Sequence, residues 1–216
     1  MFVPTMTIPE AIAEASRDLV SVQRKLAHTI QEQERAHRKN RRGGDIVGHF
    51  TYTSPLQNNW LYVITTNKKQ SFHAVLMWFY AADGLTGLQL ASEGLPYIYP
   101  PHFFKRFRER SGEGDTDAEL NLRNYFFRNP SPCTMYTDKL HLGFPAILGA
   151  MPDGYVLGTA HADEGYMRCR TFISHAEAFK NQQEHWEGLE AARQLRERFP
   201  VLFAQVRAQG LARKAA

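Results

Sequence analysis

Residues 60–91, WLYVITTNKKQSFHAVLMWFYAADGLTGLQLA, decide the fold class of this chain. Its apolar runs are rich in β-branched and aromatic residues, and turn-forming residues separate them at Asn67-Lys68-Lys69-Gln70 and at Asp83-Gly84. Turn chemistry between successive strands favours an antiparallel meander. With one more run after the glycine pair at positions 43 and 44, the expected strands cover residues 46–53, 60–66, 72–82 and 85–91.

Toward the C-terminus, prolines interrupt the strands and helical patterns follow. Pro101 suits the first turn of a helix over residues 101–110, and a second helix is expected over residues 118–127. Alternating runs then return. The expected strands cover residues 134–142, 146–151, 155–160 and 166–173, the last two forming a hairpin.

The sequence patterns at both ends of the chain predict helices. Residues 8–42 carry an apolar stripe at spacings of three and four, opened by Thr7 as N-cap. That stripe requires a partner surface, which is either the rest of this chain or a second protein. Near the other end, Ser174 and Glu177 fit a capping box, and a further helix is expected over residues 194–209.

These patterns predict an α+β protein: an antiparallel β-sheet with packed helices, a long N-terminal helix and C-terminal helices. The expected division is a long N-terminal helical arm at 1–44, an α+β core domain at 45–174 and C-terminal helices at 175–216. Self-association or a protein partner through the N-terminal helix follows as a hypothesis.

Composition narrows the function classes. Hydrophobic residues make up 43% of 216, so the chain has ample material for a core, and its 26 Lys and Arg against 22 Asp and Glu permit an anionic partner. No signal-like or membrane-spanning run occurs, so we expect a cytoplasmic protein without a membrane partner. The two cysteines and nine histidines form no metal motif, and no phosphate loop occurs, so neither metal nor cofactor is expected.

The segment from Pro100 to Arg110, PPHFFKRFRER, carries the clearest chemistry. On a helix, His102, Arg106 and Arg110 share one polar row, with Lys105 beside it. An imidazole moves protons near neutral pH, and guanidinium groups stabilise phosphate charge. Histidine and arginine are the minimum set of side chains that RNA transesterification requires, a reaction in which a 2′-hydroxyl attacks its own phosphodiester.

The strand at 166–173 supplies a second basic set. Strict alternation predicts Arg168, Arg170, Phe172 and Ser174 on one face of this strand, and Thr171 on the other. If the helix of His102 lies across this strand, one concave site collects both basic sets. Thr171 or Ser174 then lies near its edge.

A helix with the pattern His-x-x-x-Arg-Phe-x-x-Arg, a second helix, a short antiparallel sheet and a closing Arg-Thr-Phe strand resembles the barnase–colicin–RelE-like superfold of small ribonuclease toxins. The resemblance covers residues 99–174, about a third of the chain. It does not extend to the N-terminal helix, the first meander or the C-terminal helices.

The resemblance implies a metal-independent ribonuclease, a hydrolase-class RNA-binding enzyme without a cofactor. The catalytic residues it implies are His102 as general acid or base, with Arg106, Arg110, Arg170 and Thr171, and the substrate-binding residues are Lys105, Arg168 and Ser174. The alternative is a non-enzymatic nucleic-acid-binding or protein-interaction (assembly) protein of phage or mobile-element type.

Overall fold

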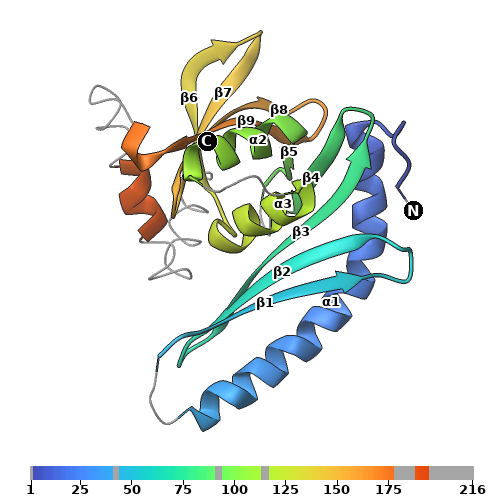
Figure 1. Ribbon diagram of the computed structural model, residues 1–216, viewed down its shortest axis with the longest axis vertical. Helices are drawn as coiled ribbons and strands as arrows, with labels where there is room; N and C mark the ends of the chain where they lie inside the picture. The colour runs from blue at the N-terminus through green and yellow to red at the C-terminus, as the bar shows by residue number, and fades with distance from the viewer. Residues whose placement is uncertain (1, 41–43, 91–93, 113–116, 178–187, 195–216) are drawn as a thin grey trace, which may run out of the picture.

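A computed structural model describes residues 2–40, 44–90, 94–112, 117–177 and 188–194. Its described strands form one nine-stranded sheet in the order β1-β2-β3-β4-β5-β9-β8-β7-β6, with helices on both faces (Figure 1). The predicted α+β class is therefore confirmed.

Among the described residues, the chain forms three long helices, nine strands and one 3-10 turn. They are α1 (Ile8–Lys39), β1 (Ile46–Thr53), β2 (Asn59–Thr66), β3 (Ser71–Ala81), β4 (Gly84–Leu90), β5 (Tyr97–Tyr99), α2 (Pro101–Ser111), α3 (Ala118–Arg128), β6 (Cys133–His141), β7 (Phe144–Met151), β8 (Gly154–His161), β9 (Tyr166–Ser174) and the short 3-10 helix η1 (His175–Glu177). Residues 188–194 are also helical.

Two antiparallel meanders, β1–β5 and β6–β9, meet in the middle of the sheet. The joint is the parallel pair β5–β9, in which Tyr97 lies opposite Met167 and Ile98 opposite Arg168. All other neighbouring strands are antiparallel. Since β5 is three residues long, its pairing with β9 ends at Arg168, and beyond that point β9 contacts α2.

Helix α1 covers one face of the first meander. Its N-terminus carries the predicted capping box between Thr7 and Glu10. Its apolar stripe packs on alternate side chains of β2 and β3, so the stripe is covered by this chain's own sheet. The cluster contains Ala11, Ala15, Val22, Leu26, Trp60, Tyr62, Ile64, Val75, Met77 and Phe79.

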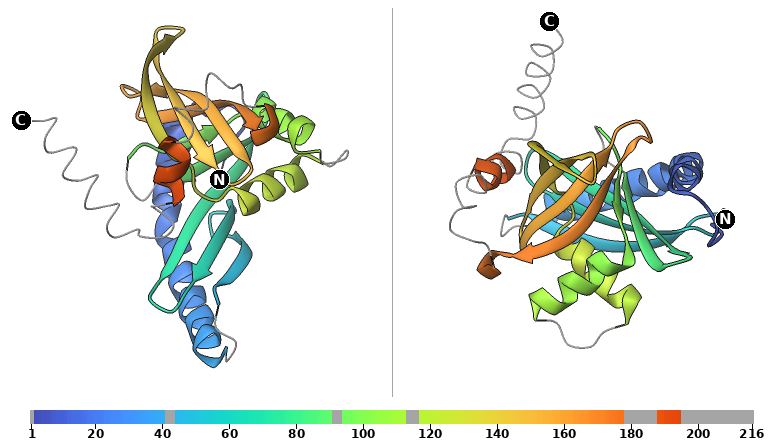
Figure 2. Two further views of the ribbon diagram at one scale, coloured as in Figure 1. Left: turned by 90° about the vertical axis from the view of Figure 1, so that its left-hand side faces the viewer. Right: turned by 90° about the horizontal axis from the view of Figure 1, so that it is seen from above.

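Helices α2 and α3 cover the opposite face (Figure 2, right). Their aromatic residues pack on the other side of β2 and β3 and on β9, which joins the two meanders into one core. The main cluster contains Leu61, Leu76, Trp78, Tyr99, Phe103, Phe104, Phe107, Leu122, Tyr125, Phe126, Cys169 and Phe172.

A buried carboxylate ties α1 to the sheet. Asp18 is 2% exposed and accepts hydrogen bonds from the indole of Trp60 (2.8 Å) and the amide of Asn58 (3.0 Å). Burial by itself would raise the pKa of Asp18, but hydrogen bonds from Ser54, Trp60, Ser21 and Asn58 lower it overall. The carboxylate therefore stays charged and holds the helix in register.

The predicted elements agree closely with the observed ones, with two differences. Strand β5 was not predicted, because its three residues lie between Pro96 and Pro100, where a loop is the ordinary expectation. The helix expected from Ser174 onward starts with a 3-10 turn, His175–Glu177, and residues 188–194 within its expected length are helical. Residues 178–187 and nearly all of the helix expected over residues 194–209 lie outside the described residues.

The β6–β7 hairpin projects from the second meander (Figure 1). Its turn contains Leu142 at φ 53° and Gly143 at φ 84°, the left-handed pair that a tight hairpin requires. Large apolar side chains are exposed along it, so the hairpin contributes little to the core at its tip. They are Met135, Tyr136, Leu140, Leu142 and Phe144.

Candidate functional site

Helix α2 begins beside β9 because β5 carries the chain there. Strand β5 runs parallel to β9 and ends at Tyr99, and Pro100 and Pro101 turn the chain into α2 with no intervening loop. Phe103, Phe104 and Phe107 are buried in the core below, which fixes the rotation of the helix. The first exposed polar side chain of α2 is therefore placed next to the middle of β9.

His102 is that side chain. Its imidazole is exposed and donates a hydrogen bond to the backbone carbonyl of Arg170, and the guanidinium groups of Arg168 and Arg170 lie near it. Partial desolvation, followed by the positive charge of Arg168 and then of Arg170, lowers the pKa of His102 below its ordinary value. The opposing effects of the carbonyl and of Asp83 are smaller in sum. The imidazole is thus neutral at neutral pH, with one nitrogen held by β9.

Arg170 occupies a β-bulge. In the pairing of β8 with β9, Leu157 lies opposite Thr171 and Gly158 opposite Cys169, so Arg170 is the extra residue of β9. A bulge reverses the alternation of side chains beyond it. Cys169 and Phe172 accordingly pack into the same core, and the prediction that Arg168, Arg170, Phe172 and Ser174 share one face is wrong.

Arg110 lies at the other end of α2 and reaches the same strand. Its guanidinium donates to the backbone carbonyl of Phe172 and to Thr171 Oγ1 (3.4 Å), and its Nε lies 3.3 Å from a carboxylate oxygen of Glu177. The carbonyls of Arg170 and Phe172 both lie beyond the last residue pair of β5 with β9, and each accepts a hydrogen bond from α2. Helix α2 therefore satisfies through His102 and Arg110 the carbonyls that β5 leaves open.

The other predicted site residues belong to α2 and β9, near the contacts that His102 and Arg110 make with β9. Arg106 forms an ion pair with Glu109 (2.8 Å), and Lys105 is exposed on α2. The hydroxyl of Ser174 donates to Glu177 (3.2 Å). The structure thus brings His102, Arg168 and Arg170 together, and places Arg110 with Thr171 at a second point.

Two acidic residues of this region were missed by sequence reasoning. Asp83 lies in the turn between β3 and β4, close enough for its charge to act on His102, and Glu177 binds Arg110. Asp83-Gly84 and Ser174-x-x-Glu177 are ordinary turn and cap signals, and neither indicates a contact with α2. A pattern search along the sequence could not have found them.

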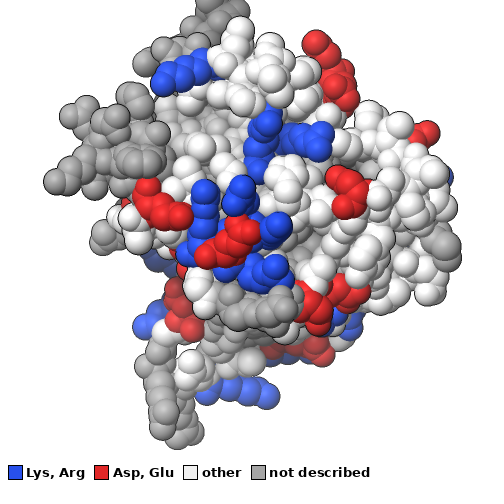
Figure 3. Space-filling view, turned by 45° about the horizontal axis from the view of Figure 1, so that its top comes forward, with Lys and Arg blue, Asp and Glu red and all other residues white. Residues whose placement is uncertain are grey.

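Basic side chains gather on the face that carries α2, with acidic ones among them (Figure 3). The basic residues of α2 and β9 are Lys105, Arg106, Arg108, Arg110, Arg168 and Arg170. Carboxylates of Glu109 and Glu177 offset part of this charge. The positive charges of Arg168 and Arg170 both act on the His102 imidazole, so an anion bound beside His102 would be attracted by both.

Most aromatic side chains of β2 and β3 are buried and therefore not available to stack on nucleic-acid bases. Trp60, Tyr62, Trp78 and Phe79 are buried, and Tyr80 is the exposed member of that set. The hydroxyl of Tyr80 donates to Glu119 (3.2 Å). Trp60, Tyr62 and Phe79 belong instead to the core under α1.

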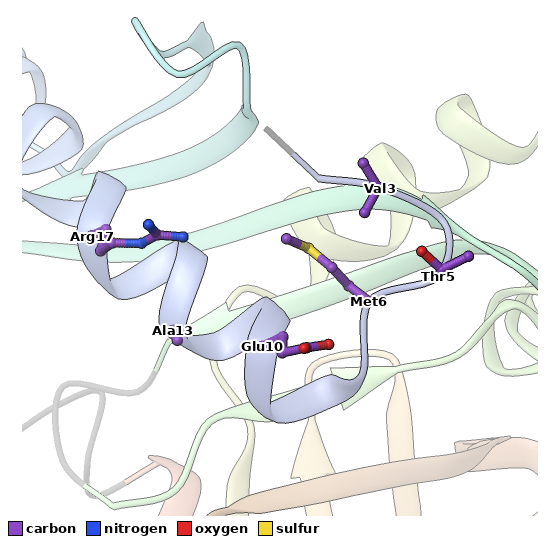
Figure 4. A pocket seen from close by; sticks show the side chains of 6 residues that line it. All are labelled: Val3, Thr5, Met6, Glu10, Ala13 and Arg17. Carbon is purple, nitrogen blue, oxygen red and sulfur yellow. The ribbon is translucent and has the colours of Figure 1, made fainter.

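An open hollow of about 410 Å³ lies away from the His102 region, where the N-terminal residues pass the start of α1 (Figure 4). None of its lining residues belongs to α2 or β9, so the hollow is separate from the site. It is lined by Val3, Thr5, Met6, Glu10, Ala13 and Arg17.

Within the part of the chain that the structure describes, no three His, Cys, Asp or Glu side chains gather as metal ligands would. Among the same residues, no helix is long and apolar enough to cross a bilayer. Comparison with protein-family models, with curated proteins and with solved structures finds no match to this chain.

Proposed function

We propose that this protein cleaves RNA by metal-independent transesterification at His102. The observation that carries the proposal is the placement of one exposed imidazole, fixed by the carbonyl of Arg170, beside the guanidinium groups of Arg168 and Arg170. A base next to two phosphate-binding cations is what attack by a 2′-hydroxyl on its own phosphodiester requires.

In the proposed reaction, the free imidazole nitrogen of His102 removes the proton of the ribose 2′-hydroxyl. The 2′-oxygen then bonds to the adjacent phosphorus, and the bond from phosphorus to the 5′-oxygen breaks. The leaving oxygen takes a proton from solvent, and the products are a 2′,3′-cyclic phosphate and a 5′-hydroxyl. Arg168 and Arg170 hold the phosphoryl oxygens as charge develops on them.

The lowered pKa of His102 supports the role of general base, because the neutral form predominates at neutral pH. Arg110 has a positioning role in this proposal, since its guanidinium is engaged by Phe172, Thr171 and Glu177. Arg106 and Lys105 are exposed on α2 and provide contacts for flanking phosphates.

The order of elements adds support. Residues 101–174 form two helices followed by the four-stranded meander β6–β9, with the first helix packed on the last strand. This is the order that a resemblance to the barnase–colicin–RelE-like ribonucleases implies. The proposed assignment to that superfold rests on this order and on the His-x-x-x-Arg pattern.

The test is cleavage of labelled RNA in EDTA by the wild-type chain, His102→Ala and Arg170→Gln. The matched control is His28→Ala, which removes an exposed histidine on α1. We expect both site variants to lose about 100-fold or more in rate and the control to keep the wild-type rate. Equal rates in His102→Ala and the wild type, with folding verified by circular dichroism, would overturn the proposal.

A further inference from the structure

The end of α1 and the turn between β2 and β3 enclose a second, polar hollow of about 220 Å³. The two segments are about thirty residues apart in sequence and meet at the end of the sheet where β3 begins (Figure 1). All the lining residues are polar or charged. They are Glu34, His37, Arg38, Thr66, Asn67, Lys68, Lys69 and Gln70.

Positive charge dominates this hollow. Arg38, Lys68 and Lys69 are exposed, whereas the carboxylate of Glu34 accepts a hydrogen bond from the hydroxyl of Ser71 (3.1 Å). That bond also fixes the start of β3 to α1. The hollow therefore presents three cations around one carboxylate that is already hydrogen-bonded.

The turn that carries the two lysines is held in one shape. Asn67 Oδ1 accepts hydrogen bonds from the backbone N–H groups of Lys69 (2.8 Å) and Gln70 (3.0 Å), and the Asn67 N–H donates to the Gln70 carbonyl (3.0 Å). The hydroxyls of Thr66 and Ser71 lie 2.9 Å apart across its base. Little backbone order would have to be gained when an anion binds to the lysines.

Strand β3 sets the distance from this hollow to the His102 site. The strand has 11 residues, starts at Ser71 beside the hollow and ends at Ala81, two residues before Asp83. At roughly 3.3 Å per residue it spans about 36 Å. Stacked nucleotides of one strand rise about 3.4 Å each, so about eleven of them cover this distance.

We propose that the hollow of Arg38, Lys68 and Lys69 is a second binding site for the phosphate backbone of the RNA substrate. The inference rests on the proposed function and deepens it, because it selects RNA longer than about eleven nucleotides over short oligonucleotides. A protein partner fits less well, because the lining lacks the apolar and aromatic residues that form interface cores. Phosphate contacts need only fixed cations in a concave surface.

The experiment compares the full wild-type chain with Lys68→Gln/Lys69→Gln. The control is Arg24→Gln/Lys25→Gln, which removes the same charge from an exposed part of α1. Binding of fluorescein-labelled 2′-O-methyl RNA of 20 nucleotides, which cannot transesterify, is measured by anisotropy against salt. Cleavage of an ordinary 6-nucleotide RNA is measured in the same preparations.

We expect the lysine variant to bind the 20-mer about 10-fold more weakly at low salt, with a salt slope smaller by about two, and to cleave the 6-mer at the wild-type rate. An unchanged affinity, an equal loss in the control or a wild type that does not bind the 20-mer would overturn the inference. Lysine-dependent binding without any cleavage of the 6-mer would instead overturn the proposed function. The two failures are thus distinguishable.

Discussion

At the scale of the residue, the account depends on the charge state of His102. Desolvation and the nearby guanidinium groups of Arg168 and Arg170 lower the pKa of the imidazole below the ordinary histidine value of about 6.5. The neutral imidazole, which is the active base, therefore persists at pH values below about 6.5. The acid limb of kcat/KM should therefore have its midpoint below that value, because kcat/KM reports the free enzyme. Activity is lost as pH falls through this midpoint.

Arg168→Gln removes one of the charges that disfavour the imidazolium form. We expect the midpoint of the acid limb to move to higher pH, in addition to a fall in rate. Arg106→Gln serves as the control, because Arg106 pairs with Glu109 on α2, and should leave the midpoint in place. A midpoint that is the same in Arg168→Gln and the wild type would show that His102 is not the titrating base.

At the scale of the element, the bulge in β9 sets the direction of Arg170. Gly158 pairs with Cys169, next to the bulge, and a Cβ there would collide with the backbone carbonyl of Arg168. We expect Gly158→Ala to destabilise the fold by about 1–3 kcal/mol and to reduce RNA cleavage by the molecules that remain folded. Urea denaturation and rates corrected for the folded fraction measure the two effects separately.

Gly149→Ala is the matched control on the neighbouring strand β7. The added Cβ would lie 3.0 Å from the methyl group of Thr134, a side chain, and the Cys133 carbonyl oxygen would be at an ordinary contact distance of 3.8 Å. We expect a smaller loss of stability and a wild-type rate per folded molecule. A Gly158→Ala variant that is as active as Gly149→Ala would contradict the role given to the bulge.

Sequence patterns predicted most elements of this fold because each carries its own local signal. Pro101 opens α2, Thr7 caps α1 and Asp83-Gly84 turns β3 into β4. Strand β5 carries no such signal because its parallel pairing with the distant strand β9 holds it in the sheet. The bulge at Arg170 lies within the β8–β9 hairpin, and no turn or cap residue marks it in the sequence. That the helix of His102 lies on β9 was a condition of the sequence hypothesis and followed from no pattern, and the direction of the side chains beyond the bulge was predicted wrongly.

At the scale of the whole molecule, α1 is part of the core. Its stripe packs on β2 and β3, and Asp18 binds Asn58 and Trp60 beneath it. Asp18→Ala would leave both donors buried without an acceptor. We expect the free energy of unfolding to fall by about 2–4 kcal/mol, measured by urea denaturation, with Glu32→Ala on the exposed face of α1 as the control.

Asp18 also makes the stability of the fold depend on pH, and the stability falls as the solution becomes acidic. Because the folded-state pKa of Asp18 is lowered, the unfolded chain takes up a proton at higher pH than the folded chain does. Its stabilising contribution is complete above about pH 4, the unfolded value, and is lost as pH falls through the folded-state pKa. The stability difference between the wild type and Asp18→Asn should shrink in that acid range and be constant near neutrality.

The central claim is that the chain cleaves RNA by using the ribose 2′-hydroxyl at His102, and one substrate pair tests it most directly. An end-labelled RNA and the same sequence made of DNA are incubated with excess protein in EDTA, and the product ends are identified. The account predicts cleavage of the RNA alone, with 2′,3′-cyclic phosphate ends. Intact RNA, or equal cleavage of both strands, would contradict it.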